Sequence, residues 1–139
     1  MFTTILETIG LFSVATLFGG MVFFPSVVAP TVFRVLDSEN AGRFLRALFP
    51  GYYLFIVIIA GIGGLALYKS PILAAGLLGV AVSTLAVRQL LVPQINDWRD
   101  AELAGDATAA AKFNAGHRIS VLINLAQMAF VAWALFGLL

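Results

Sequence analysis

Four long apolar stretches, separated by short polar connections, are the main feature of the hydrophobic pattern. They run from about Thr3 to Phe33, from Tyr52 to Tyr68, from Ile72 to Val92 and from Ala107 to Leu139. A helix of about 20 mostly apolar residues crosses the hydrocarbon core of a bilayer, so each stretch is long enough to span it. The pattern predicts an all-α fold, an integral membrane four-helix bundle that forms a single transmembrane domain over residues 1–139.

The connection between the first two stretches has a helical period of its own. Between Asp37 and Phe49 the apolar residues recur at helical spacing, and Arg43 and Arg46 lie on the opposite face. An amphipathic helix of this kind lies in the plane of the membrane interface. We therefore predict a short interfacial amphipathic helix between the first and second spans, capped by Asp37 or Ser38 and ended by Pro50.

Prolines and small residues indicate how the spans bend and pack. We expect Pro25 and Pro30 to kink the first span, and Pro93 to end or kink the third. Small residues four positions apart let membrane helices approach closely. The predicted packing positions are Ala15/Gly19 and Thr16/Gly20 in the first span, Ala60/Gly64 in the second, and Ala75, Gly79 and Ser83 in the third.

Composition supports the membrane assignment. Hydrophobic residues make up 61% of the chain and charged residues 11%, and the mean hydropathy is +1.01, whereas about a quarter of the residues of a soluble domain are charged. The net charge of +1 carries little information. The chain has no cysteine, which excludes disulfides and thiolate metal ligands.

Positive charge is divided unequally between the two sides of the membrane. With four spans, the first and third connections share one side, which carries Arg34, Arg43, Arg46, Arg99 and Lys112. The opposite side has Lys69 alone. Because cytoplasmic loops are enriched in Lys and Arg, we expect both connections in the cytoplasm. In a bacterium this corresponds to the cytoplasmic (inner) membrane with both termini in the periplasm.

Polar residues within the spans are the candidates for function. On the last span His117, Ser120, Asn124 and Gln127 share one helical face. That face must meet protein or water, because an unpaired amide in hydrocarbon costs several kcal/mol. Arg88 and His117 both lie about 7–8 Å inside the expected interface. We predict a ligand-binding cluster in the cytoplasmic half of the bundle, formed by Arg88, His117, Ser120, Asn124, Gln127 and Tyr52.

Three segments, FRVLDSENAGRFLRALFPGYY, VRQLLVP and FNAGHRISVLINL, resemble the transmembrane protein 205 family, whose bacterial members are grouped as a domain of unknown function. The resemblance implies four membrane helices. Animal members have been associated with drug resistance and solute movement, and they use cysteines that this chain lacks. The positions that match the family's motifs are Phe49, Pro50, Arg88, Pro93, Phe113, His117, Ser120 and Asn124.

Three functions fit the predicted cluster. It can bind or translocate a small ligand or ion, with His117 changing protonation near neutral pH and Arg88 holding an anionic group. It can bind haem or quinone through His117, with Met21 or Met128 as a second axial ligand. It can also be purely structural, in an accessory or assembly subunit of a larger membrane complex. We predict the first function.

Other kinds of chemistry find little support in the sequence. No nucleophile–base pair, phosphate loop or nucleic-acid surface is recognisable, so we expect binding rather than enzymatic activity. With one histidine and no cysteine we expect no metal site, and His117, Met21 and Met128 are the only weak candidates for ligands. The expected partners are the lipid bilayer and either a second copy of the chain or a larger membrane complex.

The predicted orientation has a direct test. A reporter that is active only in the periplasm, fused after Leu139, should be active when the protein is produced in a bacterium. A matching reporter that needs the cytoplasm should be silent at the same position. Activity of the cytoplasmic reporter would show that the distribution of arginine and lysine does not set the orientation.

Overall fold

The computed structural model describes residues 2–139, with side chains described from residue 4 onward. Its helical segments join into four long apolar helices, which confirms the prediction of four helices able to span a membrane. The segments are α1 (Phe2–Phe23), the π-helix η1 (Phe24–Val28), α2 (Ala29–Val35), α3 (Ser38–Ala66), α4 (Pro71–Ala86), the π-helix η2 (Val87–Leu91), α5 (Val92–Leu103) and α6 (Ala107–Leu138).

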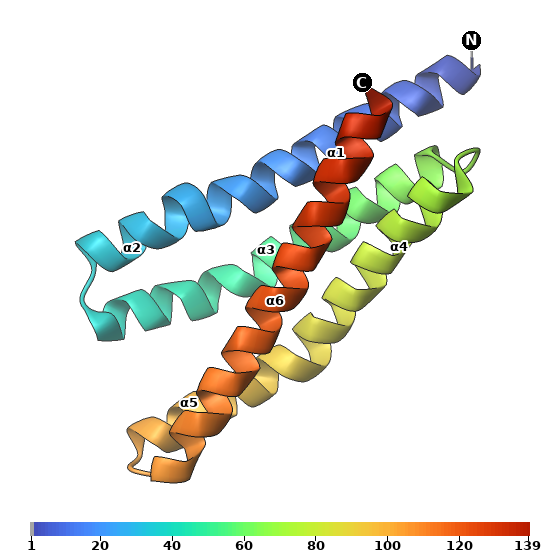
Figure 1. Ribbon diagram of the computed structural model, residues 1–139. Helices are drawn as coiled ribbons and strands as arrows, with labels where there is room; N and C mark the ends of the chain where they lie inside the picture. Colours follow the sequence, from blue (N-terminus) through green and yellow to red (C-terminus); the bar gives the residue numbers. More distant parts are fainter. Residues whose placement is uncertain (1) are drawn as a thin grey trace.

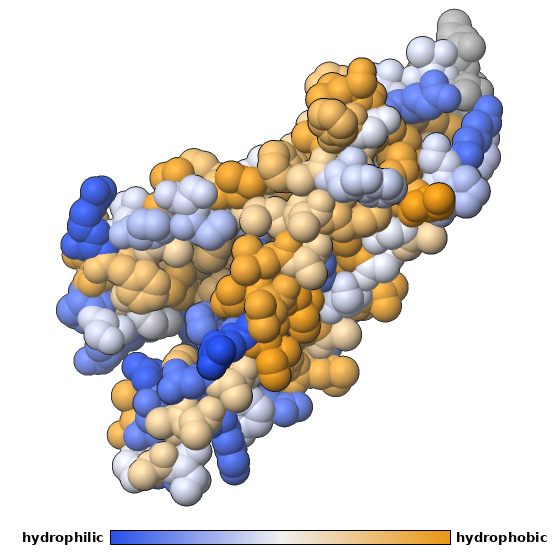
Figure 2. All heavy atoms as spheres, in the orientation of Figure 1, coloured by the Kyte–Doolittle hydropathy of each residue, from blue (hydrophilic) through white to orange (hydrophobic). Residues whose placement is uncertain are grey.

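The four long helices run up and down. Figure 1 shows α1 beginning and α6 ending at one end of the molecule, while the α2–α3 and α5–α6 connections lie at the other. Helix α1 packs against α3 and α6, α3 packs against α4, and α5 packs against α6. Figure 2 shows hydrophobic side chains across the middle of the visible face and hydrophilic ones gathered toward its ends. This arrangement is that of a membrane helix bundle.

The prediction of a separate interfacial helix is wrong. Helix α3 begins at Ser38 and continues to Ala66 with Pro50 inside it. Proline removes a single backbone donor, and a membrane helix keeps its remaining backbone hydrogen bonds because hydrocarbon offers no substitute partners. The 29 residues of α3 reach about 43 Å, which exceeds a hydrocarbon core of about 30 Å. The amphipathic residues therefore form the first turns of a long helix.

Both π-helical segments end two residues before a proline. In η1 the backbone N–H of Ala29 donates to the Phe24 carbonyl, and Pro30 follows. In η2 the N–H of Val92 donates to the Val87 carbonyl, and Pro93 follows. A proline lacks the N–H and its ring crowds the carbonyl four residues earlier, and the wider π turn relieves this crowding. The expected kinks at Pro30 and Pro93 thus take the form of π turns.

The turns at the arginine-rich end are fixed by capping residues. The Asp37 carboxylate accepts the Asn40 backbone N–H, and the Asp106 carboxylate accepts that of Thr108. The hydrogen bond from the Asn40 N–H holds the pKa of the Asp37 carboxyl below its usual value, and those from the Thr108 hydroxyl and N–H do the same for Asp106. The caps therefore stabilise the helices above the ordinary carboxyl pKa and lose this effect as the pH falls through the lowered one. Gly105, with φ of 101°, lies just beyond the end of α5, where a left-handed residue commonly terminates a helix.

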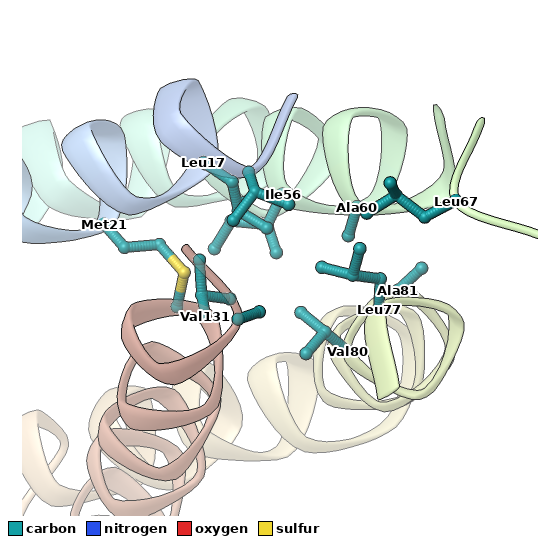
Figure 3. Close-up of a cluster of buried hydrophobic side chains, with 11 residues drawn as sticks. Leu17, Met21, Ile56, Ala60, Leu67, Leu77, Val80, Ala81 and Val131 are labelled. Carbon is teal, nitrogen blue, oxygen red and sulfur yellow. The ribbon is translucent and has the colours of Figure 1, made fainter. Parts of the chain in front are cut away.

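A tightly packed hydrophobic core lies in the half of the bundle that contains the termini. Figure 3 shows side chains from α1, α3, α4 and α6 meeting there. Leu17, Ile56, Leu77 and Val131 are fully buried in it. Contact between helices inside a bilayer depends on such close packing, since lipid is as apolar as the side chains.

Glycines allow the close approach, at positions partly different from those predicted. Ala60 and Gly64 are buried as expected, but a side chain at Gly19 or Gly79 would meet no neighbour within 4 Å. The contacts are instead at Gly20, against Phe55, and at Gly76. A Cβ at Gly76 would lie 2.0 Å from the tip of the Phe130 ring. The ring of α6 therefore inserts against the bare backbone of α4.

Gly76→Ala should lower the stability of the protein in detergent, whereas Gly79→Ala on the same helix should not. The alanine at position 76 displaces the Phe130 ring, and overpacking of this kind costs about 1–3 kcal/mol. The thermal midpoint of each variant gives the comparison. If both alanines shift the midpoint equally, the insertion of Phe130 does not determine how α4 and α6 pack.

Candidate functional site

The side chains of the predicted cluster are divided among separate contacts rather than gathered at one point. Gln127 bonds to α4, Asn124 bonds to α3, and Arg88 reaches the backbone of α3. His117 and Ser120 make their contacts within α6. The predicted residues therefore serve different roles, which their geometry distinguishes.

Gln127 ties α6 to α4 in the membrane. Its side-chain N–H donates to the Ser83 hydroxyl at 2.8 Å and to the Thr84 hydroxyl at 3.1 Å. The Ser83 hydroxyl donates in turn to the Gly79 carbonyl at 2.7 Å. Gln127 and Thr84 are buried. These bonds satisfy polar groups that lipid would leave unpaired, so this part of the polar stripe is structural.

Asn124 and Tyr52 approach one another across the bundle. The Asn124 amide donates to the Tyr52 hydroxyl at 3.5 Å, the long limit of a hydrogen bond. The Tyr52 ring also stacks on Phe24 with centroids 4.5 Å apart. Phe24 belongs to η1, so this contact links the π turn of the first helix to α3. The pair marks the level at which the packed core gives way to polar side chains.

His117 lies exposed on α6 and makes its ring contact within that helix. Its ring stacks on Phe113 with centroids 6.1 Å apart, and the Arg99 guanidinium lies 5.2 Å from the centre of the Phe113 ring. Ser120 donates to the backbone carbonyl of His117. Within the described part of the chain no hydrogen bond joins His117 to Arg88. The matching depth of the two residues does not bring them together.

The sulfur ligands considered for haem do not lie opposite the histidine. Met21 is fully buried in the hydrophobic core, and Met128 packs against the same core. Met128 and His117 are eleven positions apart on one helix, about 16 Å along its axis. Among the described residues no three His, Cys, Asp or Glu side chains gather as metal ligands. The residues present do not form a paired axial site.

An open groove of about 420 Å³ lies between α3 and the η2–α5 segment. Arg88 lines it, and its Nε donates to the Pro50 carbonyl at 3.3 Å. No other hydrogen bond or ion pair engages its guanidinium within the described chain. A cation with free donors at membrane depth is the expected mark of a functional site. The residues that line the groove include Pro50, Tyr53, Arg88, Val92, Asn96 and Asp97.

An ion pair joins the two walls of this groove beyond Arg88. Arg46 of α3 donates to the Asp100 carboxylate of α5 at 2.8 Å, and also to the Asn96 carbonyl. This contact was not predicted, because Arg46 was expected on the polar face of a separate interfacial helix. The contact could have been found from the spacing of Arg46 and Pro50, which are four residues apart and share one face of a continuous helix. Because α3 runs through Pro50 without interruption, this face is turned toward α5.

These features define an all-helical protein of the integral membrane type, with a packed half and an open polar groove. The family model described as Domain of unknown function (DUF4149) matches residues 12–102, from α1 to the end of α5. The chain belongs to this family. The match includes Tyr52 and Arg88 and ends before α6, which carries His117 and Gln127. No curated protein and no solved structure matches the chain.

Two double-mutant cycles should distinguish a pair of residues that are hydrogen-bonded to each other from a pair that are not. Gln127→Leu and Thr84→Val should show a coupling free energy of about 0.6 kcal/mol, the average for membrane hydrogen bonds, because one bond is lost in either variant. His117→Ala and Arg88→Ala should be additive. Unfolding in mixed detergent measures both cycles. Coupling between His117 and Arg88 larger than that between Gln127 and Thr84 would contradict this division.

Proposed function

We propose that this protein binds a small amphiphilic ligand in the groove between α3 and η2–α5, with Arg88 as the residue that holds the ligand's anionic group. The observation that carries the proposal is the guanidinium of Arg88, which uses one donor for the Pro50 carbonyl and presents the others to an open groove. A guanidinium matches the oxygens of carboxylate and phosphate with paired donors.

Binding is better supported than translocation. The half of the bundle beyond Tyr52 and Asn124 is filled by the hydrophobic core, and Gln127 there is engaged by Ser83 and Thr84. A ligand that enters the groove reaches Arg88 and then meets packed side chains, as in a binding protein.

Two further assignments belong to this proposal. We infer a relationship to the transmembrane protein 205 family, on the motif residues of α3, η2 and α6 named above, and a place in the bacterial inner membrane with both termini in the periplasm. The structure is compatible with this orientation because the arginine-rich connections share one end of the bundle. Arg88 and Pro50, both motif positions, are hydrogen-bonded to each other.

The proposal is tested by native mass spectrometry of protein extracted in mild detergent. The wild-type protein should retain an amphiphile, and Arg88→Gln should lose most of it, because the amide is uncharged. Arg43→Gln is the matched control, since Arg43 is exposed and pairs with Glu39 away from the groove. Thermal midpoints show that both variants are folded. Equal retention by the two variants would rule out Arg88 as the binding residue.

A further inference from the structure

The groove holds two opposite charges that do not neutralise one another. Arg88 and Asp97 both line it, and no ion pair joins them. Asp97 makes no hydrogen bond or ion pair with any residue in the described part of the chain. The neighbouring charges are already engaged, Arg46 with Asp100 and Arg99 with Glu102. The groove therefore presents one free cation and one free anion to an occupant.

The order of these charges along the membrane normal is fixed by the helix. Arg88 is in η2 and Asp97 follows nine residues later in α5, toward the α5–α6 turn. The separation along the axis is about 13 Å. The cation is therefore deeper in the membrane and the anion closer to water. A complementary ligand carries its negative group nearer the hydrocarbon and its positive group farther out.

We propose that the groove binds the headgroup of a zwitterionic aminophospholipid of the phosphatidylethanolamine type. This inference rests on the proposed function and names its ligand. In such a lipid the phosphate is bonded to the glycerol that carries the acyl chains, and the ammonium group extends beyond the phosphate toward water. The phosphate then meets Arg88, and the ammonium group donates to the Asp97 carboxylate. Both charges are satisfied by one molecule in its ordinary orientation in the leaflet.

The surroundings of the groove fit a lipid better than a soluble zwitterion. Val92, Pro93 and the ring of Tyr53 contribute apolar atoms to the lining. Leu54 and Leu90, each next in sequence to a lining residue, are 44% and 65% exposed, and in a bilayer they meet acyl chains. The ion pair between Arg46 and Asp100 closes α3 against α5. A headgroup therefore has room beside Arg88, with its chains running past the leucines.

The charge order also predicts selectivity against an anionic lipid. Phosphatidylglycerol offers the same phosphate to Arg88 but has no cation for Asp97, and its headgroup hydroxyls can donate to that carboxylate without balancing its charge. One charge-assisted hydrogen bond corresponds to about a tenfold change in affinity. Since Asp97 is close to water, we expect wild-type protein to prefer phosphatidylethanolamine over phosphatidylglycerol by about three- to tenfold.

Native mass spectrometry with defined lipids tests this selectivity. Delipidated wild-type protein is titrated with phosphatidylethanolamine and phosphatidylglycerol of identical acyl chains, and Asp97→Asn and Arg88→Gln are titrated in parallel. Asp97→Asn should abolish the preference, mainly by weakening binding of phosphatidylethanolamine. Arg88→Gln should weaken both lipids. Arg43→Gln, outside the groove, should behave as wild type.

The outcomes separate this inference from the proposed function. If wild-type protein binds both lipids equally, or if Asp97→Asn keeps the preference, the zwitterionic headgroup is excluded, while loss of binding in Arg88→Gln still supports an amphiphile site. If Arg88→Gln binds both lipids as wild type does, both proposals fail. Competition by soluble glycerophosphoethanolamine as strong as that of the intact lipid would also overturn the inference, because the acyl chains would then contribute nothing.

Discussion

Hydrocarbon offers no hydrogen-bond partners, and this single constraint governs how each polar group of the chain is placed. The amide nitrogen of Gln127, near the middle of the bundle, donates to two hydroxyls on α4. At Pro30 and Pro93 the backbone adopts π turns that keep the neighbouring N–H groups bonded. Among the described residues, no buried side-chain nitrogen or oxygen lacks a partner. Hydrophilic side chains on the face shown in Figure 2 gather toward the ends of the molecule.

The result is a bundle with two different halves. In the half with the termini, Phe130 inserts at Gly76 and apolar side chains of α1, α3, α4 and α6 pack together. In the other half, α3 and α5 are joined by the Arg46–Asp100 ion pair but leave a groove between them. The packed half supplies the rigidity that a binding site needs, and the open half supplies the charges. The proposed binding site therefore lies in the groove, and the packed core lies in the other half.

Sequence pattern was sufficient for the four helices, because long apolar stretches have few structural alternatives. It also identified Asp37, with Ser38 as the alternative, as a helix cap, where short-range chemistry decides. It failed at Pro50, because losing one backbone hydrogen bond costs less than ending a long membrane helix there. It also failed at Gly79, because the face that a helix turns to its neighbour depends on tertiary packing. Depth placed Arg88 and His117 at one level, but depth does not specify the direction in which each side chain points.

The central claim, a hydrated groove beside a dry core, is tested most directly by thiol labelling in native membranes, because the chain has no cysteine of its own. Gln89→Cys, in the groove, should react readily with a water-soluble maleimide. Leu90→Cys, the adjacent residue that faces lipid, and Ala60→Cys, in the core, should react slowly. Reaction at Gln89→Cys no faster than at Leu90→Cys would contradict the account, since it would show that water does not enter between α3 and η2–α5.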